Sequence, residues 1–146
     1  MNIASPAFQN NGDMPSRYTC HGDNINPELR ISNVPSGTKS LVLILDDPDA
    51  PMGTWDHWIL FNIRPSTAVI PENSVPPGAV QGRNSWGNSE YGGPCPPSGK
   101  HRYVFKLYAL SRILDIGHST VKNDIYKAMS GSVISQAEFT GTYQKP

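Results

Sequence analysis

LVLILDDPDAPMG, residues 41–53, runs a strand of aliphatic residues directly into a group of aspartates and prolines. Since a strand that is apolar on both faces is typical of the centre of a sheet, Ser40 to Leu45 is predicted to lie in the core. The carboxylates of Asp46, Asp47 and Asp49 then stand where a central strand leaves the core, a location that is costly for charge. Asp and Pro also favour turns for local reasons, so this segment alone indicates a strand-ending turn more readily than a site.

Two further segments have strand character. Leu29 to Ser32 is predicted to pair antiparallel with Ser40 to Leu45 across the turn VPSGT, because Pro, Ser and Gly favour a tight turn. Tyr103 to Leu110 is another predicted strand, and His101 lies just before its first residue. The period of two places these side chains on one face: His101, Tyr103, Phe105, Leu107 and Ala109.

The segment Trp55 to Ile63 is rich in aromatic and β-branched residues, so it is predicted to be a strand buried on both sides. Strict alternation gives one face Trp55, His57, Ile59 and Phe61, and gives the other face Trp58 and Leu60. A buried imidazole such as His57 needs a partner for each ring nitrogen. Alone, His57 or His101 is more often a satisfied core histidine than a ligand.

The remaining chain is predicted to be loop, helix and a last strand. Residues 70–97 hold too many prolines and glycines for central strands, except for a short piece near Val80. A helix is predicted between residues 119 and 131, with Ser119 as its N-cap and with Val121, Ile125 and Met129 facing a sheet. Residues 134–139 extend a second short helix or begin the last strand, and residues 138–143 alternate as an edge strand does.

Length and charge narrow the class of protein. A chain of 146 residues fits one domain, residues 1–146, because a core of this size buries about two-thirds of the unfolded surface. Lys plus Arg number 12, as do Asp plus Glu, so no broad basic field attracts nucleic acid or anionic membrane. The start of the chain lacks the apolar stretch of a signal peptide, and no run spans a bilayer. We expect a cytoplasmic protein without nucleic-acid partners or integral membrane association.

The two cysteines, Cys20 and Cys95, form neither a CxxC motif nor a zinc site. In a reducing compartment they are expected to be thiols. If they pair, the long closed loop stabilises the fold by about 4–5 kcal/mol on the chain-entropy model. The sequence leaves both states open.

A second candidate feature is EYGGPCPPSGKHRYVF, residues 90–105, which joins a Pro- and Gly-rich loop to the strand that opens with His101. Glycine lets backbone N–H groups approach a ligand closely, and loops of this kind bind oxyanions. An ordered Ω-like loop without a ligand explains the same residues equally well.

Three motifs taken together resemble the phosphatidylethanolamine-binding protein family, also called Raf kinase inhibitor-like proteins. They are DPDAP (residues 47–51), WDHWILFNI (55–63) and GPCPPSGKHRYVF (93–105), in the family's order. SPAF, MPSRYTCHGDNINPEL, VPSGTKSLVLI, LYAL and GTYQK extend the resemblance, to the short prokaryotic-type members, over nearly the whole chain. Three spaced motifs are far more specific than one short motif such as GxGxxG.

By this resemblance the family's anion pocket maps onto nine residues of this chain. They are Asp47, Asp49, His57, Gly93, Pro94, His101 and Tyr103, with Tyr91 and Pro96 as wall residues. We expect the two histidines to donate hydrogen bonds to an anion and the two aspartates to orient them, because carboxylates favour cationic imidazoles. No metal or cofactor is expected.

The resemblance implies a mainly β fold, in which a large antiparallel sheet packs on a smaller one as a β-sandwich. One or two helices are expected in the C-terminal half, with one covering the other face of the large sheet. A cis peptide bond is implied between Ala50 and Pro51, because X–Pro bonds adopt cis at little cost. Larger eukaryotic members continue with another helix over the pocket, so we expect here a more open pocket, or one covered by a second copy in a homodimer.

The predicted function is non-enzymatic binding of phosphate or a phospholipid headgroup, with possible regulation of a kinase or protease. The inferred pocket is too small for acyl chains. One alternative is a hydrolase in which the same Asp and His residues hold a divalent metal or act as acid and base. No activated Ser or Cys nucleophile is evident for it. Another alternative is inhibition of a protease or kinase through a surface loop such as Pro71 to Gly78.

Overall fold

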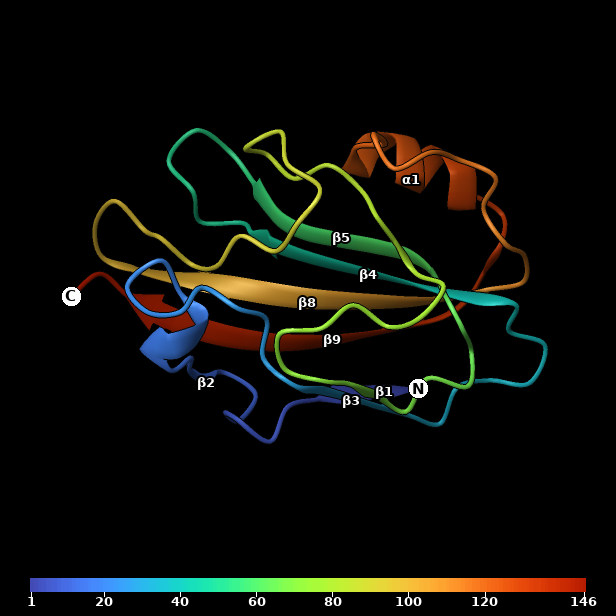
Figure 1. The fold of residues 1–146 in the computed structure, drawn as a ribbon, viewed down its shortest axis with the longest axis horizontal. Coiled ribbons are helices and arrows are strands. Elements are labelled where there is room, and N and C mark those ends of the chain that lie inside the picture. The colour runs from blue at the N-terminus through green and yellow to red at the C-terminus, as the bar shows by residue number, and fades with distance from the viewer.

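The computed structural model describes all 146 residues, which form two β-sheets and one α-helix (Figure 1). The larger sheet contains, in spatial order, β2 (Gly12–Asp13), β9 (Val133–Gln144), β8 (Lys100–Leu110), β4 (Ser40–Asp47), β5 (Trp55–Ile63) and β7 (Val80–Gln81). The smaller sheet contains β1 (Asn2–Ala4), β3 (Leu29–Ser32) and β6 (Val69–Ile70). Neighbouring strands are antiparallel except β2 and β9. The mainly β prediction is therefore confirmed.

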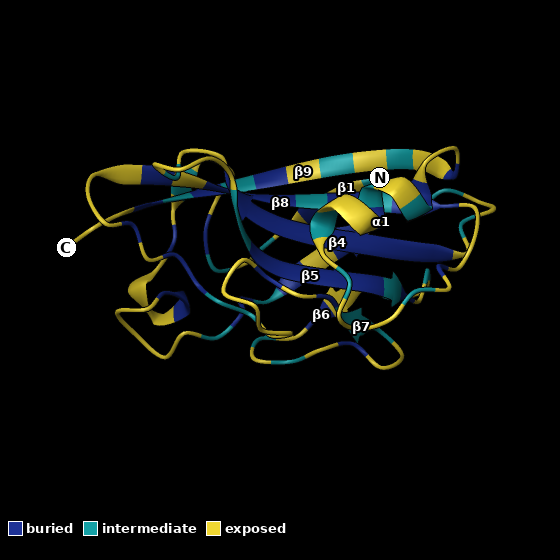
Figure 2. Cartoon of the chain, turned by 90° about the horizontal axis from the view of Figure 1, so that it is seen from above, coloured by how far each residue is buried: buried dark blue, intermediate teal, exposed yellow.

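The central strand β4 is buried along its whole length, as its aliphatic run predicts, and Figure 2 shows it in continuous dark blue. Its side chains alternate between two apolar clusters. Leu41, Leu43 and Leu45 pack toward the smaller sheet, whereas Val42 and Ile44 pack toward the helix. The alternation continues past the aliphatic residues, so Asp46 and Asp47 leave the strand on opposite faces.

The helix α1 (Lys122–Met129) covers the face of the larger sheet that is opposite the smaller sheet. Ile125 and Met129 are buried there, and Gly131 follows the helix with a φ of +79°. The N-cap is Val121 rather than Ser119, so the predicted start was two residues early. With eight residues, α1 is far shorter than the about 20 that a membrane crossing requires.

One predicted strand pairing was wrong. Leu29–Ser32 and Ser40–Asp47 lie in different sheets, because β3 pairs with β1 and β6. The strand β3 alternates buried and exposed residues, which suits an outer sheet, whereas β4 needs a layer on each side. Of the two alternatives for residues 134–139, the structure has the last strand, because the single long strand β9 includes them.

The peptide bond between Ala50 and Pro51 is trans, so the predicted cis bond is wrong. The N–H of Gly53 donates to the carbonyl oxygen of Ala50 at 3.2 Å, which places Pro51 second in a four-residue turn. Proline at that position is trans, whereas the cis-proline turn carries it third.

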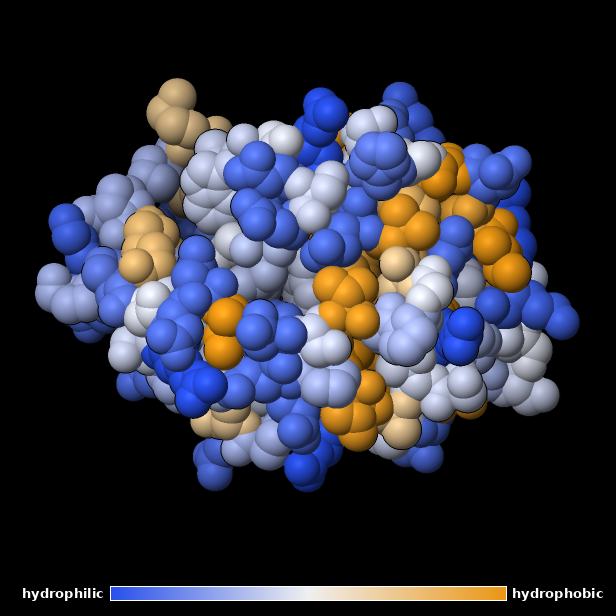
Figure 3. All heavy atoms as spheres, in the orientation of Figure 1, coloured by the Kyte–Doolittle hydropathy of each residue, from blue (hydrophilic) through white to orange (hydrophobic).

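The surface of the protein mixes hydrophilic and hydrophobic side chains. On the face shown in Figure 3, hydrophilic side chains cover most of the area, and hydrophobic ones reach the surface in small groups, mainly in the right half of the view. The most exposed large apolar side chain is Met52, with 97% of its surface exposed, in the loop that follows β4.

Candidate functional site

A β-bulge in β5 turns His57 toward the same end of the sheet as Asp47. The register of β4 and β5 shifts between Leu45 and Asp46, which leaves His57 as the extra residue. Strict alternation would place His57 beside Ile59, which faces α1. Its ring instead packs edge-on against Tyr103, whose ring centre is 5.3 Å away in the cluster toward the smaller sheet. The predicted face of His57 was therefore wrong, because a bulge breaks the period of two.

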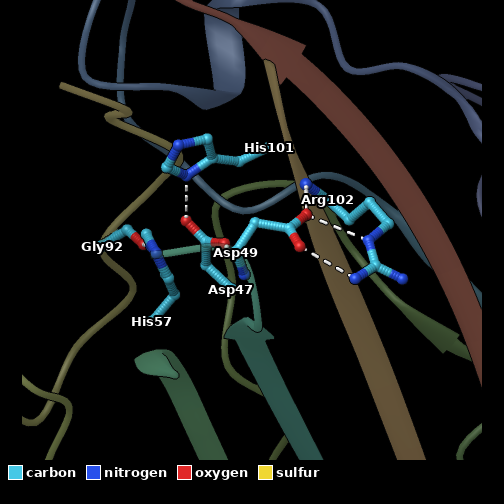
Figure 4. A network of polar contacts seen from close by, with 6 residues as sticks. All are labelled: Asp47, Asp49, His57, Gly92, His101 and Arg102. Carbon is cyan, nitrogen blue, oxygen red and sulfur yellow. Dashed lines mark hydrogen bonds and ion pairs between the residues drawn. The ribbon is translucent and has the colours of Figure 1, made fainter. Parts of the chain in front are cut away.

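The start of β8 places His101 against Asp47. Nδ1 of His101 lies 2.7 Å from Oδ2 of Asp47, and only 9% and 5% of these side chains is exposed (Figure 4). The other carboxylate oxygen accepts the backbone N–H of Asp49 at 2.8 Å. Because Asp47 accepts the Nδ1 proton, the orientation of the imidazole is set and its Nε2 has no protein partner.

His57 is held in a similar way by a backbone carbonyl. Its Nδ1 donates to the carbonyl oxygen of Gly92 at 2.7 Å, which leaves Nε2 without a protein partner. Burial lowers the pKa of His57, against the opposing effects of the Gly92 carbonyl and the charge of Asp47. At neutral pH the ring is therefore uncharged, and its Nε2 presents a lone pair.

These side chains line a cavity of about 270 Å³ at one end of the larger sheet. Five predicted site residues contribute to it: Asp47, His57, Pro96, His101 and Tyr103. Sequence reasoning missed the apolar wall, which consists of Ala50, Pro51, Met52, Gly53, Trp55, Trp86, Cys95 and Pro97. The DPDAP motif pointed to the turn after β4, but no local pattern pointed to Trp86.

Asp49 lies outside this cavity, because its carboxylate binds Arg102. Oδ1 lies 2.8 Å from one terminal guanidinium nitrogen, and Oδ2 lies 3.0 Å from Nε and 2.9 Å from the backbone nitrogen of Arg102. The Arg102 guanidinium lowers the pKa of Asp49 to about 2. Figure 4 shows this carboxylate turned away from His57. Its contribution to the site is the backbone N–H that binds Asp47.

Tyr91, Gly93 and Pro94 also lie outside the cavity, and their polar groups bind other parts of the chain. The Tyr91 hydroxyl donates to the carbonyl oxygen of Tyr18 at 2.7 Å. The N–H of Gly93 donates to Oδ1 of Asn24 at 2.8 Å, and the carbonyl of Pro94 accepts the N–H of Cys20 at 3.1 Å. The glycine N–H that the sequence assigned to an anion is thus already bonded. Tyr91 and Gly93 instead line a neighbouring cavity of about 350 Å³.

Two buried polar atoms at the main cavity have no hydrogen-bond partner: the hydroxyl of Tyr103 and Nε1 of Trp55. Burial and the charge of Asp47 raise the pKa of Tyr103, so its hydroxyl keeps its proton. A buried donor without a partner is costly, and such groups in folded proteins usually have a partner or a ligand. Together with Nε2 of His57 and His101, this makes four residues of the cavity lining that carry a polar group without a protein partner.

Cys20 and Cys95 form a disulfide, which is one of the two states that the sequence left open. Their Cα atoms are 5.4 Å apart, within the usual range for a disulfide. The segment after the 3₁₀ helix Ser16–Tyr18 runs beside the loop that precedes β8, a contact between residues 75 apart that no sequence pattern indicates.

Behind the site, on the helix side of the sheet, Asp46 is fully buried between two lysines. Its Oδ2 lies 3.0 Å from Nζ of Lys106 and 3.3 Å from Nζ of Lys122, which also lies 2.5 Å from Asp56. Burial opposes the charge of Lys122, but Asp56 and Asp46 hold its pKa above the usual value. The protein has no group of three or more His, Cys, Asp or Glu side chains arranged to hold a metal ion.

Comparisons with known proteins agree with the fold and the motifs. The family model described as phosphatidylethanolamine-binding protein matches residues 4–144. A UPF0098 protein of Methanothermobacter thermautotrophicus is 48% identical over 99% of both chains. A phosphatidylethanolamine-binding protein homologue of Chlamydia trachomatis has a crystal structure with a TM-score of 0.96 at 41% identity, over 99% of this chain and 97% of that one. Escherichia coli YbcL, described as a member of the mammalian family, has a TM-score of 0.92 at 31% identity, over 99% and 98% of the two chains.

Proposed function

Because this chain belongs to the phosphatidylethanolamine-binding protein family, we propose that its Asp/His cavity binds a phosphate-class anion, either free phosphate or a phosphorylated headgroup. One observation carries the proposal. Four residues that line one cavity carry a polar group without a protein partner: Nε2 of His57, Nε2 of His101, the hydroxyl of Tyr103 and the indole nitrogen of Trp55. The names of the family and of its Chlamydia homologue support a phosphorylated headgroup as the ligand class.

Each group has a defined role in this proposal. Tyr103 and Trp55 donate to anion oxygens, and His101 donates from Nε2 when its ring is doubly protonated. The neutral His57 accepts a hydrogen bond from a protonated phosphate oxygen, or donates after it takes up a proton. Asp47 orients His101 and offsets the charge on its ring, so the anion meets a charge-assisted donor rather than a bare carboxylate.

The size and lining of the cavity favour a small ligand. A volume of about 270 Å³ is just below the range of typical ligand sites, which runs from about 300 to 1,000 Å³. A phosphate with a short substituent fits this space, and acyl chains do not. The indoles of Trp55 and Trp86, whose ring centres are 5.5 Å apart, form an aromatic wall for the substituent.

Calorimetric titration with inorganic phosphate and with phosphoethanolamine tests the proposal. The unmodified protein should bind both, and His101→Ala should abolish binding because it removes the Nε2 donor. Arg102→Ala is the matched control, because Arg102 is adjacent in sequence but binds Asp49 outside the cavity. Absence of binding by the unmodified protein, or equal losses in the two variants, would contradict the proposal.

The same variants separate binding from the two rival classes. Turnover of phosphomonoesters or esters that His101→Ala abolishes would indicate a hydrolase instead. Regulation of a kinase or protease through the cavity predicts that His57→Ala and His101→Ala lose partner capture together with phosphate binding. Capture that survives both substitutions would indicate a surface loop.

A further inference from the structure

The disulfide between Cys20 and Cys95 lies between two cavities. Cys95 and Trp86 line both the Asp/His cavity and the neighbouring cavity of about 350 Å³. Both cysteines are exposed, so a reductant in solution reaches the bond. The covalent link is therefore part of the wall of the ligand cavity and is accessible from outside.

The wall segment 94–97 has few other anchors. Three of its four residues are prolines, which have no N–H group to donate. The carbonyl of Pro94 accepts a hydrogen bond at the start of the segment, and Nζ of Lys145 reaches the carbonyl of Pro97 at 3.1 Å at its end. Between these points no hydrogen bond holds Cys95 or Pro96, although both line the Asp/His cavity. Apart from the packing of the buried Pro96 side chain, the disulfide is the anchor of this part of the wall.

The surroundings of Cys20 suit it as the leaving group in thiol–disulfide exchange. Nδ1 of His21 lies 3.6 Å from Sγ of Cys20 and 3.0 Å from the hydroxyl of Tyr143, so in the tautomer with a proton on Nδ1 the Tyr143 oxygen accepts and the same N–H stabilises a departing thiolate. An external thiolate that attacks Sγ of Cys95 forms a mixed disulfide and releases Cys20. The second thiol of a dithiol reductant then displaces Cys95. The reductant becomes a disulfide, and its two protons end on Cys20 and Cys95.

We propose that this bond is a redox-sensitive clamp on the Asp/His cavity, closed when oxidised and opened by a dithiol. The inference rests on the proposed function of the cavity and adds its regulation. Reduction frees Cys95 and Pro96 while the strands that carry His57 and His101 keep their pairing. The apparent affinity for phosphate falls in proportion to the fraction of molecules whose wall is in the binding arrangement. A freed wall that holds this arrangement about a tenth of the time therefore lowers the affinity about tenfold.

The experiment compares the oxidised protein, the protein reduced with dithiothreitol, and the double variant Cys20→Ser/Cys95→Ser. Calorimetry with inorganic phosphate gives the affinity of each. Hydrogen exchange of the backbone amides in residues 92–99 gives a readout that needs no ligand, and it should accelerate on reduction while β4 and β8 stay protected. His21→Gln should slow reduction, and an unchanged rate would overturn the assignment of Cys20 as the leaving group.

A matched control separates the local effect from a general loss of stability. Ile125→Ala truncates a fully buried side chain on the helix side of the core and lowers the stability of the protein without touching the cavity. It should leave phosphate affinity unchanged, and an equal loss of affinity in this variant would overturn the clamp. Equal affinity in the oxidised and reduced protein would also overturn it and leave the proposed function intact. Failure of the oxidised protein to bind phosphate would overturn the proposed function, while the exchange of residues 92–99 still decides whether the wall opens.

Discussion

Replacing Tyr103 by phenylalanine should raise the stability of the protein and weaken its phosphate binding. Tyr103 is fully buried, and its hydroxyl has no hydrogen-bond partner within the protein. An unpaired buried hydroxyl costs about 1–3 kcal/mol, and phenylalanine removes that cost while keeping the ring contacts. A gain of about 1 kcal/mol raises the melting temperature of a chain of this length by about 2–4 °C. Differential scanning calorimetry measures it.

The affinity for phosphate should change in the opposite direction. A hydrogen bond to a charged partner contributes about 1.5–3 kcal/mol, so its loss from the bound anion weakens binding by roughly 10- to 150-fold. Isothermal titration calorimetry at constant ionic strength measures this change. The two opposite signs distinguish a ligand-facing hydroxyl from one with an ordinary structural role.

Tyr91→Phe is the matched control for this prediction. Its hydroxyl donates to the carbonyl of Tyr18, so the substitution breaks a bond inside the protein and should lower stability by about 1 kcal/mol. Phosphate affinity should not change, because Tyr91 lies outside the Asp/His cavity. The reasoning fails if Tyr103→Phe also lowers stability and leaves phosphate affinity unaltered.

Three further results are expected. Affinity for sulfate, which keeps its charge over this range, should rise as the pH falls below about 6.5. Burial lowers the pKa of His57 in the free protein, and a bound anion favours the protonated ring, so protonation and anion binding strengthen each other. The free protein should lose stability in the same range, because the unfolded chain binds that proton more readily; calorimetry that shows neither trend would contradict the role of His57. Gly93→Ala should lower the free energy of unfolding by about 1–3 kcal/mol, because a Cβ there overlaps a backbone carbonyl. Gly117→Ala meets open space and should leave that free energy unchanged, so equal urea midpoints for the two variants would refute this reasoning. Lys122→Ala should lower the free energy of unfolding, measured by urea denaturation, by about 3–5 kcal/mol, because Asp46 and Asp56 each lose an ion-pair partner. Lys127 is exposed on the same helix, and Lys127→Ala should lower it by less than about 0.5 kcal/mol.

Local sequence patterns correctly predicted the strands and the helix whose apolar residues follow a regular spacing. The aliphatic run before Asp46 identified the central strand, and the spacing of Ile125 and Met129 identified the helix and its buried face. The period of two along β8 correctly placed Tyr103 with the core and His101 at the strand end. These features succeed because each depends on neighbours a few residues away.

Long-range contacts decided the features that sequence reasoning missed or placed wrongly. The bulge at His57 appears only when β5 pairs with β4, and Trp86 reaches the cavity from a loop without a pattern of its own. Asp49 and Gly93 have their hydrogen-bond partners 53 and 69 residues away in the chain. The type of a residue therefore indicates only that it is a candidate for a site. Its hydrogen-bond partners in the folded protein decide whether its polar groups are available to a ligand.

The sequence by itself determined which strands are buried on both faces, which face of the helix is buried, and the family. These features follow from alternation, helical spacing and spaced motifs, which are properties of neighbouring residues. Only the tertiary structure decided that Cys20 meets Cys95, that Asp47 rather than Asp49 faces the cavity, and that four polar groups remain without partners there. The physical reason is that hydrogen bonds, ion pairs and disulfides are satisfied by groups close in space, and the folded backbone alone sets which distant groups are close.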